Sequence, residues 1–261
     1  MAERVRLGGM ALANGVLVHG PTAWGCAVRL PDGRLEVAAE RKKLRAADVR
    51  RPLLRGPARL VEAFAVLPAV KRALPAAQLP FERPGVAAAM VGSAFAAHGL
   101  RRSALRPAAR ELAGAVLSLA PALLALRSGE LAAYHGAEHV SIGSYEHGEA
   151  RPKEHERCGS HLVGPMLVTS VAGSLAAERA PARHRPAAKA AAAAGALAAA
   201  TEIFGWMTRH PEHPLARALA RPGHELQHRV GTDEPTPEQL EVADAALRAC
   251  LRLEDAHDHD T

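Results

Sequence analysis

Four apolar stretches without a single Asp, Glu, Lys or Arg limit the folds open to this 261-residue chain; they are residues 86–100, 112–126, 162–177 and 190–201. Each is shorter than the roughly 18 to 20 residues that a full membrane span requires. Aromatic residues make up only 3% of the chain and alanine supplies much of the apolar content, which favours closely packed helices over a sheet sandwich. Judged on length alone, the four stretches slightly favour buried helices of a soluble protein over membrane spans.

The first forty residues have the pattern of a small antiparallel sheet. Short β-prone runs occur at 16–18, 26–30 and 35–37, and the turn sequence Pro31-Asp32-Gly33 separates the last two runs. From Pro52 onward the apolar residues recur at helical spacing. We therefore predict a mainly α protein with a small N-terminal antiparallel β-meander (α+β), whose helices form a bundle that is either membrane-embedded or soluble.

Three regions follow from this pattern. Residues 1–50 are expected to form the β-meander and residues 51–235 a helical core. Residues 236–261 are expected to form a C-terminal amphipathic helix, starting at Thr236-Pro237-Glu238, with a polar, frayed tail from Glu254. Within the core, the alanine-rich residues 187–200 predict a packed helix, whereas residues 178–189 and the histidine-rich residues 210–228 have the composition of loops.

The charge and the cysteine content limit which partners and which cellular compartment are compatible with the chain. The formal net charge is +6, but arginine is spread through almost every loop and no aromatic residues are interleaved with it, so we expect no specific nucleic-acid partner. Cys26, Cys158 and Cys250 are too few for a disulfide framework, which favours a reducing compartment and leaves a thiol free to act as a ligand. The N-terminus lacks the pattern of a cleaved signal peptide.

One predicted helix carries a metal-binding pattern. His135, Glu138, His139 and Glu146 lie at offsets 0, 3, 4 and 11, which places them along one helix face. Two histidines at i and i+4 can point at one ion, and a neighbouring glutamate can be a third ligand or a general base. Gly136 is unfavourable inside a helix by about 1 kcal/mol, so we expect another part of the chain to approach closely there. The alternative interpretation is a solvated polar face.

A second segment can complete the site. His155 lies three residues before Cys158, which Gly159 follows, so a compact turn can offer nitrogen and thiolate to the same ion. The alternative is that Cys158 is an ordinary buried thiol. Glu202 interrupts an otherwise uncharged helix and needs a partner, either the metal site or, alternatively, Arg209 or Lys189.

The predicted roles are as follows. The metal is a divalent transition ion, with Zn²⁺ the best match to nitrogen and sulfur donors. We predict His135, His139 and Cys158 as ligands and Glu138 as ligand or general base; Glu146, His155 and Glu202 are ligands or groups that support them. Two functions remain open: a metal-dependent hydrolase of the peptidase or amidase type, or a non-catalytic structural metal site in a membrane assembly or scaffold protein.

Several motifs together resemble a known family. They are Gly8-Gly9-Met10-Ala11, His19-Gly20-Pro21, Pro31-Asp32-Gly33, Tyr134-His135-Gly136-Ala137-Glu138-His139, Arg157-Cys158-Gly159 and Thr201-Glu202-Ile203. The chain resembles the YqhQ-like bacterial proteins, a group described as metal-dependent enzymes with membrane-spanning segments whose reaction is not known. The resemblance extends over most of the chain.

The resemblance favours the membrane alternative, since short alanine-rich helices can span a bilayer when small residues let them pack closely. It implies a multi-pass protein of the cell membrane, and we expect the loops of the metal site to face the cytoplasm; the alternative is a soluble cytoplasmic protein. The expected partners are membrane lipids and, as an option left open, further copies of the same chain. The substrate is not indicated.

Overall fold

The fold begins with a four-stranded sheet. The computed structural model describes residues 4–100, 102–127 and 129–258. Strands β1 (Gly8–Leu12), β2 (Gly15–His19), β3 (Ala23–Arg29) and β4 (Leu35–Arg41) pair antiparallel in the order β1-β2-β3-β4. This confirms the predicted meander, and Gly33, with φ of +87°, lies in the predicted turn. The glycine-rich β1 was not predicted; it lies at the edge of the sheet, and its register pairs Gly9 with Val18.

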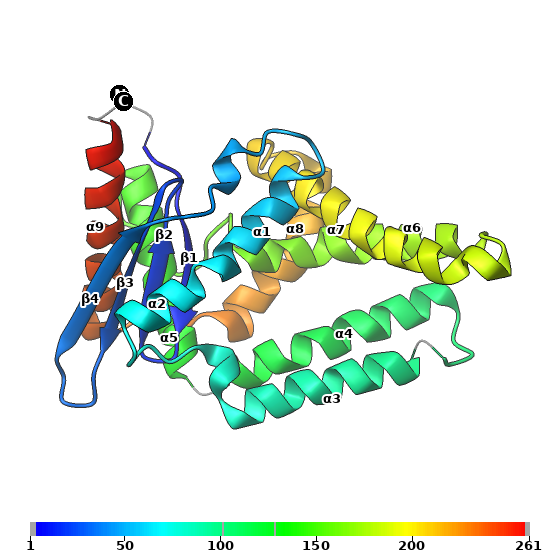
Figure 1. The fold of residues 1–261 in the computed structure, drawn as a ribbon, viewed down its shortest axis with the longest axis horizontal. Coiled ribbons are helices and arrows are strands. Elements are labelled where there is room, and N and C mark those ends of the chain that lie inside the picture. Colours follow the sequence, from blue (N-terminus) through cyan, green and yellow to red (C-terminus); the bar gives the residue numbers. More distant parts are fainter. Residues whose placement is uncertain (1–3, 101, 128, 259–261) are drawn as a thin grey trace.

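Both faces of the sheet are covered by helices (Figure 1). Helices α5 (Glu130–His147) and α9 (Pro237–Asp258) cover one face, where Val16 and Val18 pack with Ala246. Helix α2 (Leu67–Ala73) covers the other face, where Leu17 packs with Val70. Because neighbouring residues of a strand point to opposite faces, the continuous apolar run of β2 fills both cores. The predicted C-terminal helix is therefore part of the core of the sheet.

The end of α9 corrects one expectation. Glu254, predicted to start a frayed tail, is 4% exposed. Its carboxylate accepts hydrogen bonds from the backbone N–H groups of Thr22 (2.9 Å) and Ala23 (2.7 Å) in the turn between β2 and β3. The helix continues to Asp258 because this buried carboxylate anchors it to the sheet, and residues 259–261 lie outside the described part.

The chain passes from the sheet to the helical region through η1 (Ala46–Asp48) and α1 (Arg55–Ala65). A buried ion pair joins Lys42, at the end of β4, to Glu62 of α1 at 2.9 Å. Glu62 also accepts a hydrogen bond from the backbone N–H of Ala46 at 2.7 Å. Because both charges are paired and hydrogen-bonded, their burial is tolerated, and the pair fixes α1 against the sheet.

Four apolar helices project away from the sheet as two hairpins (Figure 1). Helices α3 (Pro84–Leu100, after η2, Pro80–Glu82) and α4 (Pro107–Leu126) form the first hairpin. Helices α6 (Val163–Glu178, after η3, Gly159–Leu162) and α7 (Arg185–Arg209, after η4, Ala182–His184) form the second. Helix α4 packs against α6 and so joins the hairpins. The predicted packed helix at 187–200 is confirmed as part of α7.

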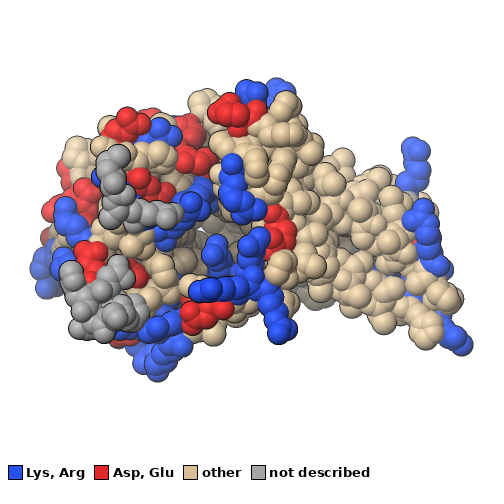
Figure 2. Space-filling view, turned by 90° about the horizontal axis from the view of Figure 1, so that it is seen from above, with Lys and Arg blue, Asp and Glu red and all other residues tan. Residues whose placement is uncertain are grey.

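The outer surface of this bundle is apolar. Large side chains such as Phe95 (75% exposed) and Val116 (61% exposed) face outward. In Figure 2 the surface of the projecting part is nearly free of charged residues, and Lys and Arg side chains gather at its far end. A broad exposed apolar surface of this kind is unfavourable in water and is the normal outer face of a helix in lipid.

Among the residues that the structure describes, three segments are long and apolar enough to cross a membrane by length and composition: Ala108–Leu126, Gly159–Glu178 and Ala182–Arg209. These segments are longer than the charge-free stretches of the sequence, because the helices continue through charged residues at their ends. Residues 178–189 were predicted to be a loop, and this is wrong for their second half. Helix α7 begins at Arg185 with Pro186 in its first turn, where proline is favourable.

The histidine-rich residues 210–228 are also helical for the most part. They contain α8 (Pro214–Leu226) and the start of the π-helical turn η5 (Gln227–Gly231). The prediction of a loop was wrong because Pro222 and the frequent arginines conceal the helical pattern. His210, His213, His224 and His228 are exposed, as predicted.

Candidate metal centre

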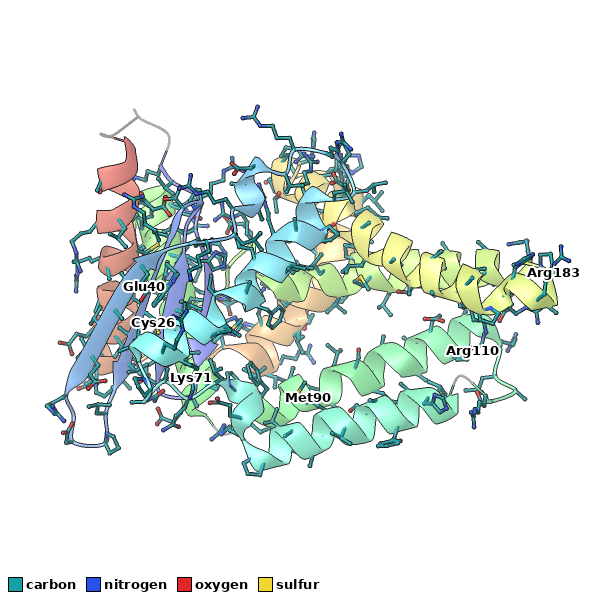
Figure 3. All side chains as sticks on the ribbon, in the orientation of Figure 1. Cys26, Glu40, Lys71, Met90, Arg110 and Arg183 are labelled. Atoms are coloured by element: carbon teal, nitrogen blue, oxygen red, sulfur yellow. The ribbon has the colours of Figure 1, made fainter. Side chains whose placement is uncertain are left out.

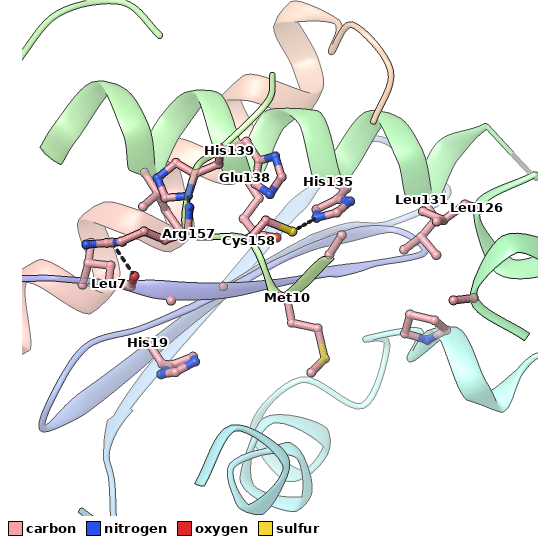
Figure 4. Close-up of a pocket in the computed structure, with 18 of the residues that line it drawn as sticks. Leu7, Met10, His19, Leu126, Leu131, His135, Glu138, His139, Arg157 and Cys158 are labelled. Atoms are coloured by element: carbon pink, nitrogen blue, oxygen red, sulfur yellow. Dashed lines mark hydrogen bonds between the residues drawn. The ribbon is translucent and has the colours of Figure 1, made fainter. Parts of the chain in front are cut away.

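Three of the predicted ligands converge. His135 and His139, one turn apart on α5, and Cys158, just before η3, place potential ligand atoms within 4.8 Å of one another. Figure 4 shows both imidazoles and the thiol on the same side of α5, above strand β1. The Sγ of Cys158 lies 3.6 Å from Nε2 of His135. Two nitrogens and one sulfur form a donor set that suits zinc.

Hydrogen bonds fix both imidazoles in the orientation that a metal ligand needs. Nδ1 of His135 lies 2.7 Å from the carbonyl oxygen of Gly231, and Nδ1 of His139 lies 2.6 Å from that of Lys153. A carbonyl only accepts, so each Nδ1 carries a proton and donates it. A histidine ring that carries its proton on Nδ1 alone has a free lone pair on Nε2, the arrangement typical of zinc-bound histidine. Burial lowers the pKa of His139, which favours this neutral form.

Gly136 allows the segment with the Gly231 carbonyl to lie against α5. A Cβ atom added at position 136 meets the carbonyl oxygen of Asp233 at 2.1 Å. The N–H of Asp233 donates to the carbonyl of Ala132 at 3.0 Å, which binds this segment to the helix. The close approach expected at Gly136 is therefore confirmed, and only glycine fits there.

Gln227 holds the turn that carries Cys158, a role that sequence reasoning missed. It is fully buried, and its side-chain carbonyl accepts a hydrogen bond from the N–H of His155 at 2.9 Å. Its Nε2 donates to Oγ of Ser160 at 2.8 Å and lies 3.2 Å from Nδ1 of His161. The amide thus fastens both ends of the turn to η5. The one signal in the sequence was an uncharged polar residue in a strongly charged segment.

Glu138 lies beside the cluster but outside it. Its carboxylate is 6% exposed and faces β1, where a Cβ atom on Gly9 meets Oε1 at 2.4 Å. No group within the described part of the chain donates a hydrogen bond to it. Burial raises the pKa of Glu138, and the nearby His135 and His155 oppose this shift. A carboxylate held in this way next to a metal cluster is placed for proton transfer.

Glu146 and His155 support the cluster from one side. Oε1 of Glu146 accepts hydrogen bonds from the N–H of Leu7 (3.1 Å) and from the Arg157 guanidinium, and its Oε2 lies 3.5 Å from Nε2 of His155. Nδ1 of His155 accepts from the N–H of Arg157 at 3.3 Å. Nδ1 of His155 is therefore used within its own turn, whereas the buried Nε2 lies near Glu146 without forming a hydrogen bond to it. These groups brace β1 and the turn that presents Cys158.

Glu202 lies elsewhere. Its carboxylate on α7 binds the guanidinium of Arg55, with Nε at 2.9 Å, and accepts from the N–H of Leu53 at 3.0 Å. The structure does not bring it to the cavity beside the cluster. The carboxylate has the charged partner that it needs in Arg55 and not in the metal cluster; of the two basic residues named as alternatives, Arg209 acts on it only through its charge.

The other two cysteines are ordinary core residues. Cys26 in β3 and Cys250 in α9 are buried in the two cores of the sheet. Burial raises the pKa of each thiol to about 12. Cys158, by contrast, is half-buried and faces two imidazoles, so it is the thiol placed for ligation.

A cavity of about 410 Å³ opens in front of the cluster, a volume within the range of ligand sites. His135, Glu138, His139 and Cys158 all face it. The rest of its lining includes β1 and apolar side chains of α4 and α5. His135, His139 and Cys158 would offer three ligand atoms to a metal ion, and the cavity would give a second molecule access to it.

His19 lies on the opposite side of β1 from the cluster (Figure 4) and lines the same cavity. Nζ of Lys42 lies 3.1 Å from its Nδ1. Burial, and then the charge of Lys42, lower the pKa of His19 to about 3. The ring is therefore neutral; Nδ1 accepts from the ammonium group and the Nε2 proton is directed to the side of Gly8.

Comparison with known proteins identifies one region. No curated protein and no solved structure matches the chain. One family model matches a region that runs from the start of α5 through the Cys158 turn and α8 into α9. This region contains His135, His139 and Cys158, together with Glu138 and Gln227. Residues 129–253 match the model of a family described as "Protein of unknown function (DUF1385)".

Proposed function

We propose that the protein is a zinc-dependent hydrolase of the membrane, with His135, His139 and Cys158 as zinc ligands. The observation that carries the proposal is a three-donor cluster that faces a cavity and has a carboxylate, Glu138, beside it. A structural zinc site normally has four protein ligands and no access, whereas three ligands and an open side are typical of catalytic zinc.

The residues of the site have separate roles in the proposed hydrolysis of an amide or ester bond. Zinc, when bound, supplies a Lewis acid and lowers the pKa of water. Glu138 is placed to take a proton from the attacking water while the oxygen of that water bonds to the carbonyl carbon of the substrate. As the bond from that carbon to nitrogen or oxygen breaks, the same carboxyl returns the proton to the leaving atom. The hydrogen bonds to Gly231 and Lys153 keep the imidazoles oriented throughout.

Replacing Glu138 with glutamine tests this role. The amide keeps the size of the side chain but cannot take up a proton, so we expect hydrolysis to fall by a factor of about 10² to 10⁴. Zinc content should stay at the level of the unchanged protein, because Glu138 is not a member of the converging set. The measurements are elemental analysis of protein purified without chelator, and turnover of a panel of fluorogenic peptides and esters. Loss of zinc together with the fold would indicate the structural alternative.

We also propose that the two helical hairpins cross the membrane four times. Helix α3, with 17 residues, is about 25 Å long and pairs with the longer α4. Both hairpins start and end near the sheet, so the sheet and the metal centre share one side and the basic tips lie on the other; Figure 3 places Arg110 and Arg183 at the tips and Glu40 on the sheet. Three free thiols support the cytoplasm as the side of the sheet.

Cysteine labelling in intact cells tests this topology. Ala104 lies at the tip of the first hairpin and Glu40 on the sheet, and both are exposed. A membrane-impermeant maleimide is expected to label Ala104→Cys from outside, and to label Glu40→Cys only after the membrane is opened. The unchanged protein gives the background, which comes from half-buried Cys158 because Cys26 and Cys250 are buried. Labelling of both variants from the same side would exclude the crossing.

A further inference from the structure

The exposed edge of β1 faces the cavity. β1 is the outermost strand of the sheet, and only β2 pairs with it. In an antiparallel strand, alternate residues direct both N–H and C=O to the same side. Leu7 directs its groups away from β2: its N–H donates to Glu146 at 3.1 Å and its carbonyl accepts from Arg157 at 3.1 Å. The next residues with this orientation are Gly9 and Ala11.

The partners along this edge leave a gap at those two residues. Beyond them, the N–H of Ala13 donates to the carbonyl of Gln78 at 2.9 Å. Within the described ranges, no partner is found for the outward N–H and C=O of Gly9 and Ala11, and both residues line the cavity. A backbone polar group in such a place requires a hydrogen bond from water or from a ligand. The gap presents two donors and two acceptors in the spacing of a strand.

We propose that the substrate is a peptide segment that binds in extended form as an additional strand on the edge of β1. A peptide would thus be the substrate of the proposed hydrolase. Binding of the peptide does not depend on that proposed function; only its cleavage does. A strand added to β1 lies about 5 Å from it, inside the cavity and beside the cluster of His135, His139 and Cys158.

The rest of the cavity suits this substrate. Its lining also includes the apolar side chains of Leu126, Leu131 and Ile142, which can contact apolar side chains of a bound peptide. A lipid acyl chain would also match this lining, but it offers no hydrogen bond to the backbone of Gly9 and Ala11. An extended peptide satisfies both features at once, and its backbone carbonyls pass the metal ligands.

A pair of hydroxamates tests the inference on the zinc-loaded full-length protein in detergent. Acetohydroxamate measures binding to zinc alone. A tripeptide of leucine and alanine residues that ends in a hydroxamate can bind zinc and also pair with β1 as a strand. We expect the tripeptide to bind at least tenfold more tightly. Methylation of the peptide nitrogens that face β1 should lower the affinity of the tripeptide about fivefold for each hydrogen bond lost. Equal affinity of the two hydroxamates, or no effect of methylation, would overturn the proposal.

Ala11→Pro removes the donor on the protein side. The N–H of Ala11 is not used in the pairing with β2, and proline is tolerated at such edge positions. We expect Ala11→Pro to weaken tripeptide binding about fivefold and to leave acetohydroxamate binding unchanged, whereas the control Ala11→Gly keeps the donor and the affinity. An unchanged tripeptide affinity in Ala11→Pro would contradict the proposal.

A measurement that needs no metal separates this inference from the proposed hydrolase. The same tripeptide ending in a plain amide is expected to slow hydrogen exchange at the N–H groups of Gly9 and Ala11, followed by NMR. Slowed exchange in a protein that binds neither zinc nor acetohydroxamate would support the peptide site and contradict the proposed hydrolase. Zinc binding without slowed exchange would do the reverse.

Discussion

Replacement of His139 by alanine is expected to abolish stoichiometric zinc binding. His139 contributes one of three converging ligand atoms, and the carbonyl of Lys153 holds its Nδ1, which leaves Nε2 to face the cluster. Loss of a group that merely orients a ligand weakens metal binding 10- to 100-fold, so loss of the ligand itself should weaken it by on the order of a hundredfold or more. Elemental analysis and competition with a chelator of known affinity measure the change.

Two controls separate the metal centre from general effects of mutation. His224→Ala removes an exposed histidine of α8, and Glu202→Ala removes a carboxylate whose partners are Arg55 and Leu53. Both variants are expected to keep the zinc content of the unchanged protein. Zinc retention in His139→Ala, or equal loss in His224→Ala, would show that the ion is bound elsewhere.

The parts of the fold that could be predicted depend on local pattern. The i, i+4 spacing places His135 and His139 on one face wherever a helix forms, so the core of the site followed from the sequence alone. The runs at 16–18 and 26–30, with the turn at Gly33, likewise marked the sheet. Strand β1 escaped because Gly8 and Gly9 have low strand propensity. Its glycines are required by the approach of Glu138 and His19, which only the fold reveals.

The parts that could not be predicted depend on distant partners. The carbonyl groups of Gly231 and Lys153 orient the two imidazoles, and a backbone carbonyl has no signature in a sequence. Gln227 fastens the Cys158 turn from 69 residues further along the chain, and Arg55 pairs with Glu202 across 147 residues. Nothing in the local pattern distinguishes these partners from solvated residues. Sequence therefore indicated which groups can bind metal, and tertiary structure selected which of them meet.

Replacement of Gly136 by alanine is expected to destabilise the protein by about 3 kcal/mol, the upper end of overpacking effects. The added Cβ would lie 2.1 Å from the carbonyl oxygen of Asp233, which belongs to backbone and cannot rotate away. The control is Gly195→Ala in α7, where an added Cβ meets no atom within 4 Å. That change should be neutral or stabilising by up to about 1 kcal/mol, because alanine favours helix over glycine. The midpoint of thermal unfolding in detergent should fall for Gly136→Ala and should stay the same or rise for Gly195→Ala.

The same change should weaken the metal centre without touching a ligand. The segment that must move carries Gly231, whose carbonyl holds Nδ1 of His135 at 2.7 Å. Moving it loosens that imidazole, so zinc affinity should fall 10- to 100-fold, as for loss of a group that orients a ligand. A Gly136→Ala protein with unchanged stability and zinc affinity would mean that residues 231–233 do not press on α5. A loss of both would show that the close packing at Gly136 and the metal centre are one structural unit.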